Sequence, residues 1–127
     1  MNILIIGNGG REHAIARAIS TSHNCTHLYA SPGNPGISQF ATCIEMSSDN
    51  PETIIRECQK RKIEVVVIGP EVPLVSGLAD ALRNHNILAF GPSAAAAKLE
   101  GSKSFARDFC KRYKIRQPAY ELFTDIQ

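Results

Sequence analysis

Two short apolar runs, each ending in a glycine, constrain the fold of this chain more than any other feature. Residues 3–6 read Ile-Leu-Ile-Ile and are followed by Gly7, and residues 65–68 read Val-Val-Val-Ile and are followed by Gly69. Unbroken runs of this length, rich in β-branched residues, are typical of parallel strands that are covered on both faces. We predict two such strands, with 65–68 as the best candidate for the central one.

Strand and helix patterns alternate along the rest of the chain. Further strands are predicted at 27–30, 41–45 and 87–90, and helices are predicted to begin after the N-caps Asn50, Ser93 and Ser102 and to run from 74 to 82. Five alternations indicate an α/β fold with a mostly parallel five-stranded sheet, right-handed crossovers and helices on both faces. We expect the strand order 3-2-1-4-5, which makes the strands before Gly7 and Gly69 neighbours at the switch point where such sheets bind ligands.

The turn after the first strand has the composition of an anion site. Residues 7–13 read Gly-Asn-Gly-Gly-Arg-Glu-His and lead into a helix. Glycines allow a close approach of the backbone, and the free N–H groups at a helix N-terminus favour a phosphate. Arg11 adds charged donors. We therefore predict a phosphate site at Gly9, Gly10 and Arg11, with the alternative that the turn only joins strand to helix.

The same turn does not complete a dinucleotide motif. In the pattern G-x-G-x-x-G, the third glycine allows close packing of helix on strand, and here that position is Glu12. The acidic residue expected about 20 positions further on, which would bind the ribose, is also missing, because no acid occurs between Glu12 and Glu45. We expect a mononucleotide or sugar phosphate as ligand, and no useful affinity for NAD or NADP.

Two further turns leave the same edge of the sheet. Residues 31–36, Ser-Pro-Gly-Asn-Pro-Gly, follow the second strand and are either an ordinary turn or a ligand contact. Glu71 follows Gly69 and Pro70, where its carboxylate can accept hydrogen bonds from hydroxyl groups or an amine; the alternative is that it only favours the helix N-terminus. His13 lies close to the first turn, and a position on the helix surface is at least as good an explanation of it.

Charge and cysteine content exclude several classes of protein. The net charge is +2, and the basic residues gather at one end, at 98–116, which we interpret as a solvated or phosphate-facing helix, so we expect no nucleic-acid partner. The four cysteines form no C-x-x-C pair and have no histidines at metal spacing, so we expect neither zinc nor disulfides, and a reducing, cytoplasmic location. No run is long enough for a signal peptide or a membrane span.

The chain resembles the N-terminal domain of the phosphoribosylamine–glycine ligase (glycinamide ribonucleotide synthetase) family. The matching stretches, in order, are Gly-Asn-Gly-Gly-Arg-Glu-His at 7–13, Pro-Gly-Asn at 32–34, Gly-Pro-Glu-Val-Pro-Leu at 69–74, Phe-Gly-Pro-Ser at 90–93 and Leu-Glu-Gly-Ser-Lys at 99–103. The resemblance implies a Rossmann-like pre-ATP-grasp domain over 1–101. Residues 102–127 would then be a linker helix and the start of an ATP-grasp domain.

The resemblance also implies a reaction of purine biosynthesis. The full-length ligase would use ATP, with Mg²⁺ or Mn²⁺, to activate glycine as an acyl phosphate for attack by 5-phosphoribosylamine, with glycinamide ribonucleotide, ADP and phosphate as products. The chain stops at Gln127, where the ATP-grasp domain would begin, so we expect a fragment or a remnant without ligase activity of its own. The alternative is an independent regulatory module of α/β fold that binds a nucleotide or sugar phosphate.

Residue roles follow from the same resemblance. It places the ribose phosphate at Gly9, Gly10 and Arg11. It places the sugar or the amine at Gly33, Asn34 and Glu71, and the ATP phosphates at Lys103. It implies no catalytic residue and no metal ligand in this chain. We also expect the segment from Lys103 onward to be loosely held, because the apolar stripe at Phe105, Phe109 and Tyr113 would pack on a further domain.

Overall fold

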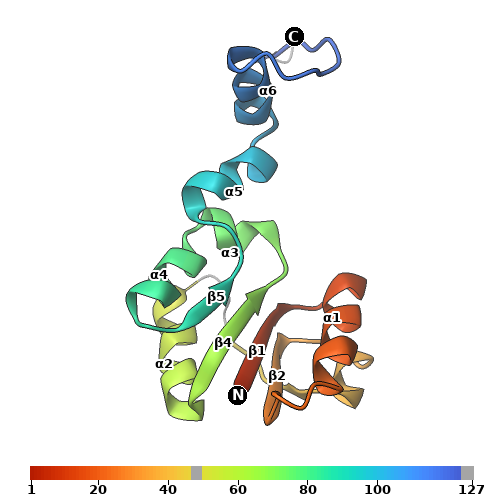
Figure 1. Ribbon diagram of the computed structural model, residues 1–127, viewed down its shortest axis with the longest axis vertical. Coiled ribbons are helices and arrows are strands. Elements are labelled where there is room, and N and C mark those ends of the chain that lie inside the picture. The colour runs from red at the N-terminus through yellow and green to blue at the C-terminus, as the bar shows by residue number, and fades with distance from the viewer. Residues whose placement is uncertain (47–49, 124–127) are drawn as a thin grey trace.

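The computed structural model describes residues 1–46 and 50–123 and contains one five-stranded sheet (Figure 1). All neighbouring strands are parallel, and their order is β3-β2-β1-β4-β5, which confirms the predicted topology. β1 occupies the middle position, so the strand predicted as central, β4, is second from the edge. Both runs are buried on both faces, and composition alone does not separate them. The strands are β1 (Asn2–Gly7), β2 (His27–Pro32), β3 (Thr42–Cys43), β4 (Ile63–Ile68) and β5 (Leu88–Phe90).

Helices cover both faces of the sheet, as the sequence predicts. Figure 1 shows α1 on one side of the sheet and α2 and α4 on the other. The helices are α1 (Gly10–Ser20), the 3-10 turn η1 (Ile37–Gln39), α2 (Pro51–Arg61), α3 (Glu71–Val75), α4 (Leu78–Asn84), α5 (Ala94–Gly101) and α6 (Lys103–Arg112).

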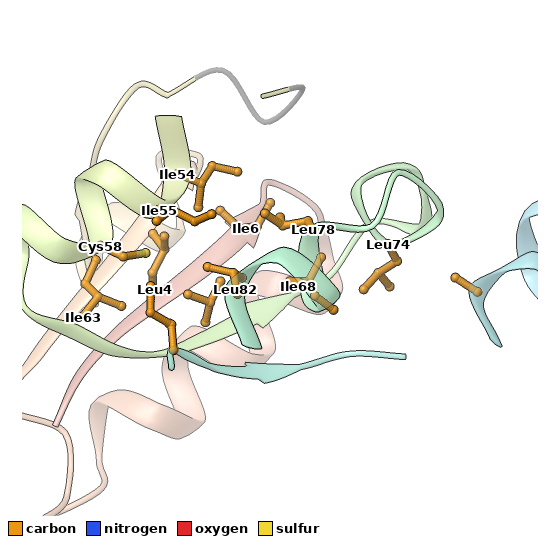
Figure 2. Close-up of a cluster of buried hydrophobic side chains, with 14 residues drawn as sticks. Leu4, Ile6, Ile54, Ile55, Cys58, Ile63, Ile68, Leu74, Leu78 and Leu82 are labelled. Atoms are coloured by element: carbon orange, nitrogen blue, oxygen red, sulfur yellow. The ribbon is translucent and has the colours of Figure 1, made fainter. Parts of the chain in front are cut away.

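Alternate side chains of the inner strands pack into two separate hydrophobic clusters. Leu4 and Ile6 of β1 belong to the larger cluster, which they form with side chains of α2, β4 and α4 (Figure 2). Ile3 and Ile5, which point to the opposite face, pack with α1 and η1. The run at 3–6 is therefore apolar throughout because β1 has no solvent-facing side.

The predicted helix starts are present. Asn50 caps α2 by accepting from Glu52 N–H at 2.9 Å, Ser93 caps α5 and Ser102 caps α6. The helix predicted over 74–82 is instead two helices, α3 and α4, separated by Gly77 in a left-handed conformation with φ +87°. A residue with a side chain disfavours that conformation, so Gly77 permits the break.

α6 stands apart from the sheet. Figure 1 shows it beyond α5, and none of its residues is buried. Its predicted apolar stripe is open to solvent, with Phe105 and Tyr113 exposed. The chain after α6 folds back on it, because Tyr120 donates its hydroxyl to Asp108 at 3.0 Å. That the segment from Lys103 onward is loosely held remains a prediction.

β5 is an open edge of the sheet. Its Leu88 and Phe90 side chains are exposed, Phe90 to 72%. Arg83 of α4 reaches this strand and donates Nη2 to the carbonyl oxygens of Ala89 at 3.1 Å and Gly91 at 2.6 Å. No helix in the described part of the chain has the length and apolar character to span a membrane.

Candidate functional site

Three turns converge at the carboxyl ends of β2, β1 and β4. Ile6 and Ile68 are paired across β1 and β4, and Gly69 N–H donates to Ile6 O at 3.0 Å. On the other side of β1, Gly33 N–H donates to Gly7 O at 3.2 Å. The turns that the sequence singled out therefore lie together at the switch point of the sheet.

Glu12 lies beneath the first turn and is almost completely buried, with 4% of its surface exposed. One carboxylate oxygen accepts from Gly9 N–H at 2.7 Å, and the other accepts from Arg11 Nε at 2.9 Å. Gly9 is the N-cap of α1 and Glu12 is its third residue, which is the carboxylate half of a capping box. The position of the third glycine in the dinucleotide motif is thus held by Glu12, whose carboxylate is buried and hydrogen-bonded.

Glycines on both turns make room for this side chain. A Cβ built on Gly7 would lie 2.7 Å from Glu12 Cγ, one on Gly9 would lie 2.8 Å from Oε2, and one on Gly69 would overlap Oε1. A Cβ on Gly10, in contrast, would meet nothing within 4 Å. Glu12 therefore explains Gly7 and Gly9, which sequence reasoning attributed to the close approach of a ligand, and it also explains Gly69. Of the glycines in the first turn, Gly10 is the one that faces open space.

Arg11 joins the two turns. Its Nε donates to Glu12 and its Nη2 donates to Gly69 O, while the side chain remains 61% exposed. Hydrogen bonding to Glu12, together with the carboxylate charge, raises the pKa of Arg11 above its ordinary value. Among the described residues Nη1 has no hydrogen-bond partner, so its two N–H groups are available to an anion.

Backbone donors lie beside this guanidinium. The first intrahelical hydrogen bond of α1 runs from His13 N–H to Gly9 O at 3.0 Å. The N–H groups of Gly10 and Arg11 therefore have no intrahelical acceptor, and they lie at the positive end of the helix dipole. Together with Arg11 Nη1 they form a set of donors suited to a phosphate.

Asn34 connects the second turn to the first. Its Nδ2 donates to Asn8 O at 2.7 Å, and its Oδ1 accepts from Ile37 N–H at 2.8 Å. Gly33 has φ +70°, and a Cβ there would lie 2.5 Å from Cys43 Sγ. Both residues therefore shape the turn and place it against the first one, and their contact with a ligand remains a prediction.

The other predicted residues lie at the border of the site. Glu71 is the first residue of α3, and with Glu100 it borders a hollow of about 310 Å³. The charges of Glu100 and Glu71 also help raise the pKa of Arg11, so both act on the guanidinium.

Lys103 is exposed in the first turn of α6 and makes no ion pair within the described ranges. His13 packs on Phe40, with ring centroids 5.7 Å apart.

Sequence reasoning missed the position of the Glu12 side chain and the carbonyl groups of Asn8 and Gly69. The spacing of Glu12, three residues after the N-cap Gly9, is the signal that could have found the first of these. Backbone acceptors carry no sequence signal of their own, because every residue has a carbonyl group.

The Glu12 carboxyl is expected to make stability depend on pH. Burial alone would raise its pKa, but hydrogen bonds from Arg11 and Gly9 outweigh burial and hold the pKa below its ordinary value. A lowered pKa contributes stability above the pKa of the unfolded chain, and that stability is lost as pH falls through the folded value. The free energy of unfolding of the wild type, measured with urea, is therefore expected to decrease as the pH drops below about 5.

A matched pair of variants tests this prediction. Glu12→Gln should flatten the loss of stability between neutral and acid pH, because the titrating group is gone. Glu57→Gln is the comparison: the pKa of Glu57 is also held below its ordinary value, mainly by hydrogen bonding to Arg61 at 3.0 Å, so this variant shows how much of the pH slope a more exposed pair contributes. Equal pH slopes for wild type and Glu12→Gln would contradict the prediction.

Comparison with known proteins identifies the relatives of this chain. Residues 1–100 match the family model described as phosphoribosylglycinamide synthetase, N domain. The chain is 52% identical over 127 residues to the phosphoribosylamine–glycine ligase of Rhizobium meliloti (strain 1021), and 52% identical over 126 residues to that of Mesorhizobium japonicum. The two matches include 100% and 99% of this chain, but the chain spans only 30% of the length of each relative.

Solved structures agree with this fold. The phosphoribosylamine–glycine ligase of Thermotoga maritima matches with a TM-score of 0.67 and 30% identity, over 95% of this chain and 27% of that one. A biotin carboxylase domain of a single-chain bacterial carboxylase matches with a TM-score of 0.64 and 17% identity, over 90% of this chain and 29% of that one. At that identity the second likeness concerns the fold alone.

Proposed function

This chain belongs to the phosphoribosylglycinamide synthetase family as its N domain, and from that premise we propose that it is the substrate-binding domain of a phosphoribosylamine–glycine ligase. The complete enzyme would join glycine to 5-phosphoribosylamine with ATP, releasing ADP and phosphate. The relatives give no support to the alternative of an independent regulatory module, because those compared above are ligases.

Arg11 carries the proposal. Its guanidinium is held at Nε and Nη2, Nη1 has no partner among the described residues, and the N–H groups of Gly10 and Arg11 at the start of the same helix have no intrahelical acceptor. A ribose phosphate needs convergent donors and a positive potential, and this end of α1 supplies both. In the proposal, Gly9 and Gly10 border the phosphate, Gly33 and Asn34 form a wall on the β2 side, and Glu71 accepts from the ribose hydroxyl groups or the amine.

The remaining parts of the reaction belong to the longer protein. We propose that residues 1–101 form the substrate domain, that 102–127 lead into an ATP-grasp domain, and that Lys103 reaches the ATP phosphates. The described residues contain no group of three metal-ligating side chains, and no step of the reaction is assigned to a metal here. The cysteines of the described part are free thiols, in keeping with the proposed cytoplasmic location.

Arg11→Ala is expected to weaken binding of ribose 5-phosphate by about 10- to 100-fold, since hydrogen bonds to charged groups are among the stronger ones. Calorimetric titration measures the affinity, and amide chemical shifts locate the ligand. Arg56→Ala is the matched control, because Arg56 is exposed on α2, which covers the face of the sheet opposite to α1. Equal affinities in wild type and Arg11→Ala, or shifts that cluster away from 7–13 and 69–74, would contradict the assignment.

A further inference from the structure

The capping role of Glu12 does not account for its surroundings. A capping box needs only the hydrogen bond to the N-cap N–H. Glu12 also lies against Gly69 on a different turn, and its second oxygen is bonded to Arg11. A buried charge is costly unless it is paired, and here Arg11 is the partner that makes the burial of Glu12 possible. The pairing itself therefore calls for an explanation beyond helix capping.

The effect of the second bond is to fix Arg11. An exposed arginine normally samples many rotamers, and holding it in place for a ligand costs binding affinity. Here Glu12 Oε1 holds Nε and Gly69 O holds Nη2, so the planar guanidinium has two anchors on its inner edge. Nη1 is thereby left without a partner among the described residues.

Two further carboxylates act on the same guanidinium at longer range. The charges of Glu100 and Glu71 both help raise the pKa of Arg11, and neither residue makes an ion pair in the described part of the chain. Both border the hollow beside α3, whereas Glu12 is the carboxylate that is hydrogen-bonded to Arg11.

We propose that Glu12 is a positioning residue for the phosphate site, acting through Arg11: its buried carboxylate holds the guanidinium between the two turns, with Nη1 directed to the ligand. This inference rests on the proposed function, since it concerns the same phosphate. Glu12 itself touches no substrate in this proposal. Its contribution to binding exists only when Arg11 is present.

A double-mutant cycle tests this dependence, with ribose 5-phosphate as the probe and the 127-residue chain as the protein. Glu12→Gln keeps the length and shape of the side chain and removes its charge. It is expected to weaken binding by about 3- to 10-fold, the cost of ordering one long side chain anew. In the Arg11→Ala background the same substitution should change affinity by less than about twofold, because there is no guanidinium left to position. Glu57→Gln, which removes the carboxylate of another arginine pair, should leave affinity unchanged.

A spectroscopic readout follows Arg11 directly. The Nε–H resonance of Arg11 should be visible at neutral pH in wild type, because that proton is hydrogen-bonded to Glu12, and it should broaden or shift in Glu12→Gln. Unfolding curves at the titration temperature establish that each variant is folded. A change of stability without a change at Arg11 Nε–H would point to a purely structural role and would overturn the inference.

The outcomes separate this inference from the function on which it rests. If Arg11→Ala weakens binding but Glu12→Gln costs the same factor in both backgrounds, or nothing in either, the positioning role is wrong and the phosphate site stands. If wild type does not bind ribose 5-phosphate, or Arg11→Ala leaves its affinity unchanged, the proposed site is wrong and the inference falls with it. A loss with Glu12→Gln that disappears in the Arg11→Ala background supports both.

Discussion

Gly69→Ala is expected to lower the free energy of unfolding by about 2 to 4 kcal/mol, because it displaces a buried carboxylate from its hydrogen bonds. Gly69 has no positive φ, so the cost does not come from backbone conformation. It comes from the new Cβ, which would overlap Glu12 Oε1 and lie 2.6 Å from its Cδ. The Glu12 carboxylate must then leave its hydrogen bonds to Gly9 and Arg11. Chemical unfolding measures the loss.

Two controls make the origin of that cost visible. Gly10→Ala should leave the free energy of unfolding unchanged or raise it slightly, because its Cβ would meet nothing within 4 Å and alanine favours the helix. The double variant Glu12→Ala, Gly69→Ala should have nearly the same free energy of unfolding as the single variant Glu12→Ala, since the side chain that would obstruct the new Cβ is gone. Full additivity of the two substitutions would show that the explanation is wrong.

Leu4→Ala is expected to cost about 3 to 5 kcal/mol, which is the upper part of the range for leucine in a core. Leu4 is fully buried in the middle strand of the sheet. Figure 2 shows it among the side chains of Ile55 and Cys58 from α2 and Leu82 from α4. Because β1 lies at the centre of the sheet, the structure around the lost side chain has little freedom to collapse into the cavity.

The matched control is Leu88→Ala, the same substitution in the edge strand of the same sheet. Leu88 is 66% exposed, so its truncation should change the free energy of unfolding by less than about 1 kcal/mol. Urea unfolding of the two variants under one set of conditions gives the comparison. A loss at Leu4 no greater than that at Leu88 would contradict the burial described for β1.

Much of the fold follows from local signals. The runs at 3–6 and 65–68 are apolar at every position, which only strands covered on both faces require, and Asn50, Ser93 and Ser102 mark helix starts through their own side chains. The break at Gly77 could not be predicted, because a single glycine is tolerated within a helical pattern. For α6, the pattern predicts an apolar stripe but carries no information about what packs on it.

The interior of the candidate site was harder to predict, for a physical reason. The direction of the Glu12 side chain depends on the space left by Gly69, which belongs to a different turn and comes much later in the chain. Sequence reasoning placed both turns together but interpreted each glycine by its local role. The structure shows that Gly7, Gly9 and Gly69 share one neighbour, and that Asn34 is held by the carbonyl group of Asn8.

The two hydrogen bonds from Arg83, one to Ala89 in β5 and one to Gly91 just after it, bear on whether another strand can add at this edge of the sheet. An edge strand with unused carbonyl groups and exposed apolar side chains such as Leu88 and Phe90 is a template on which a strand of another molecule can add. Arg83 already occupies the carbonyl groups of Ala89 and Gly91. An incoming strand would have to displace a charged guanidinium before it could pair with β5. The Arg83 side chain therefore disfavours the addition of a sixth strand at this edge.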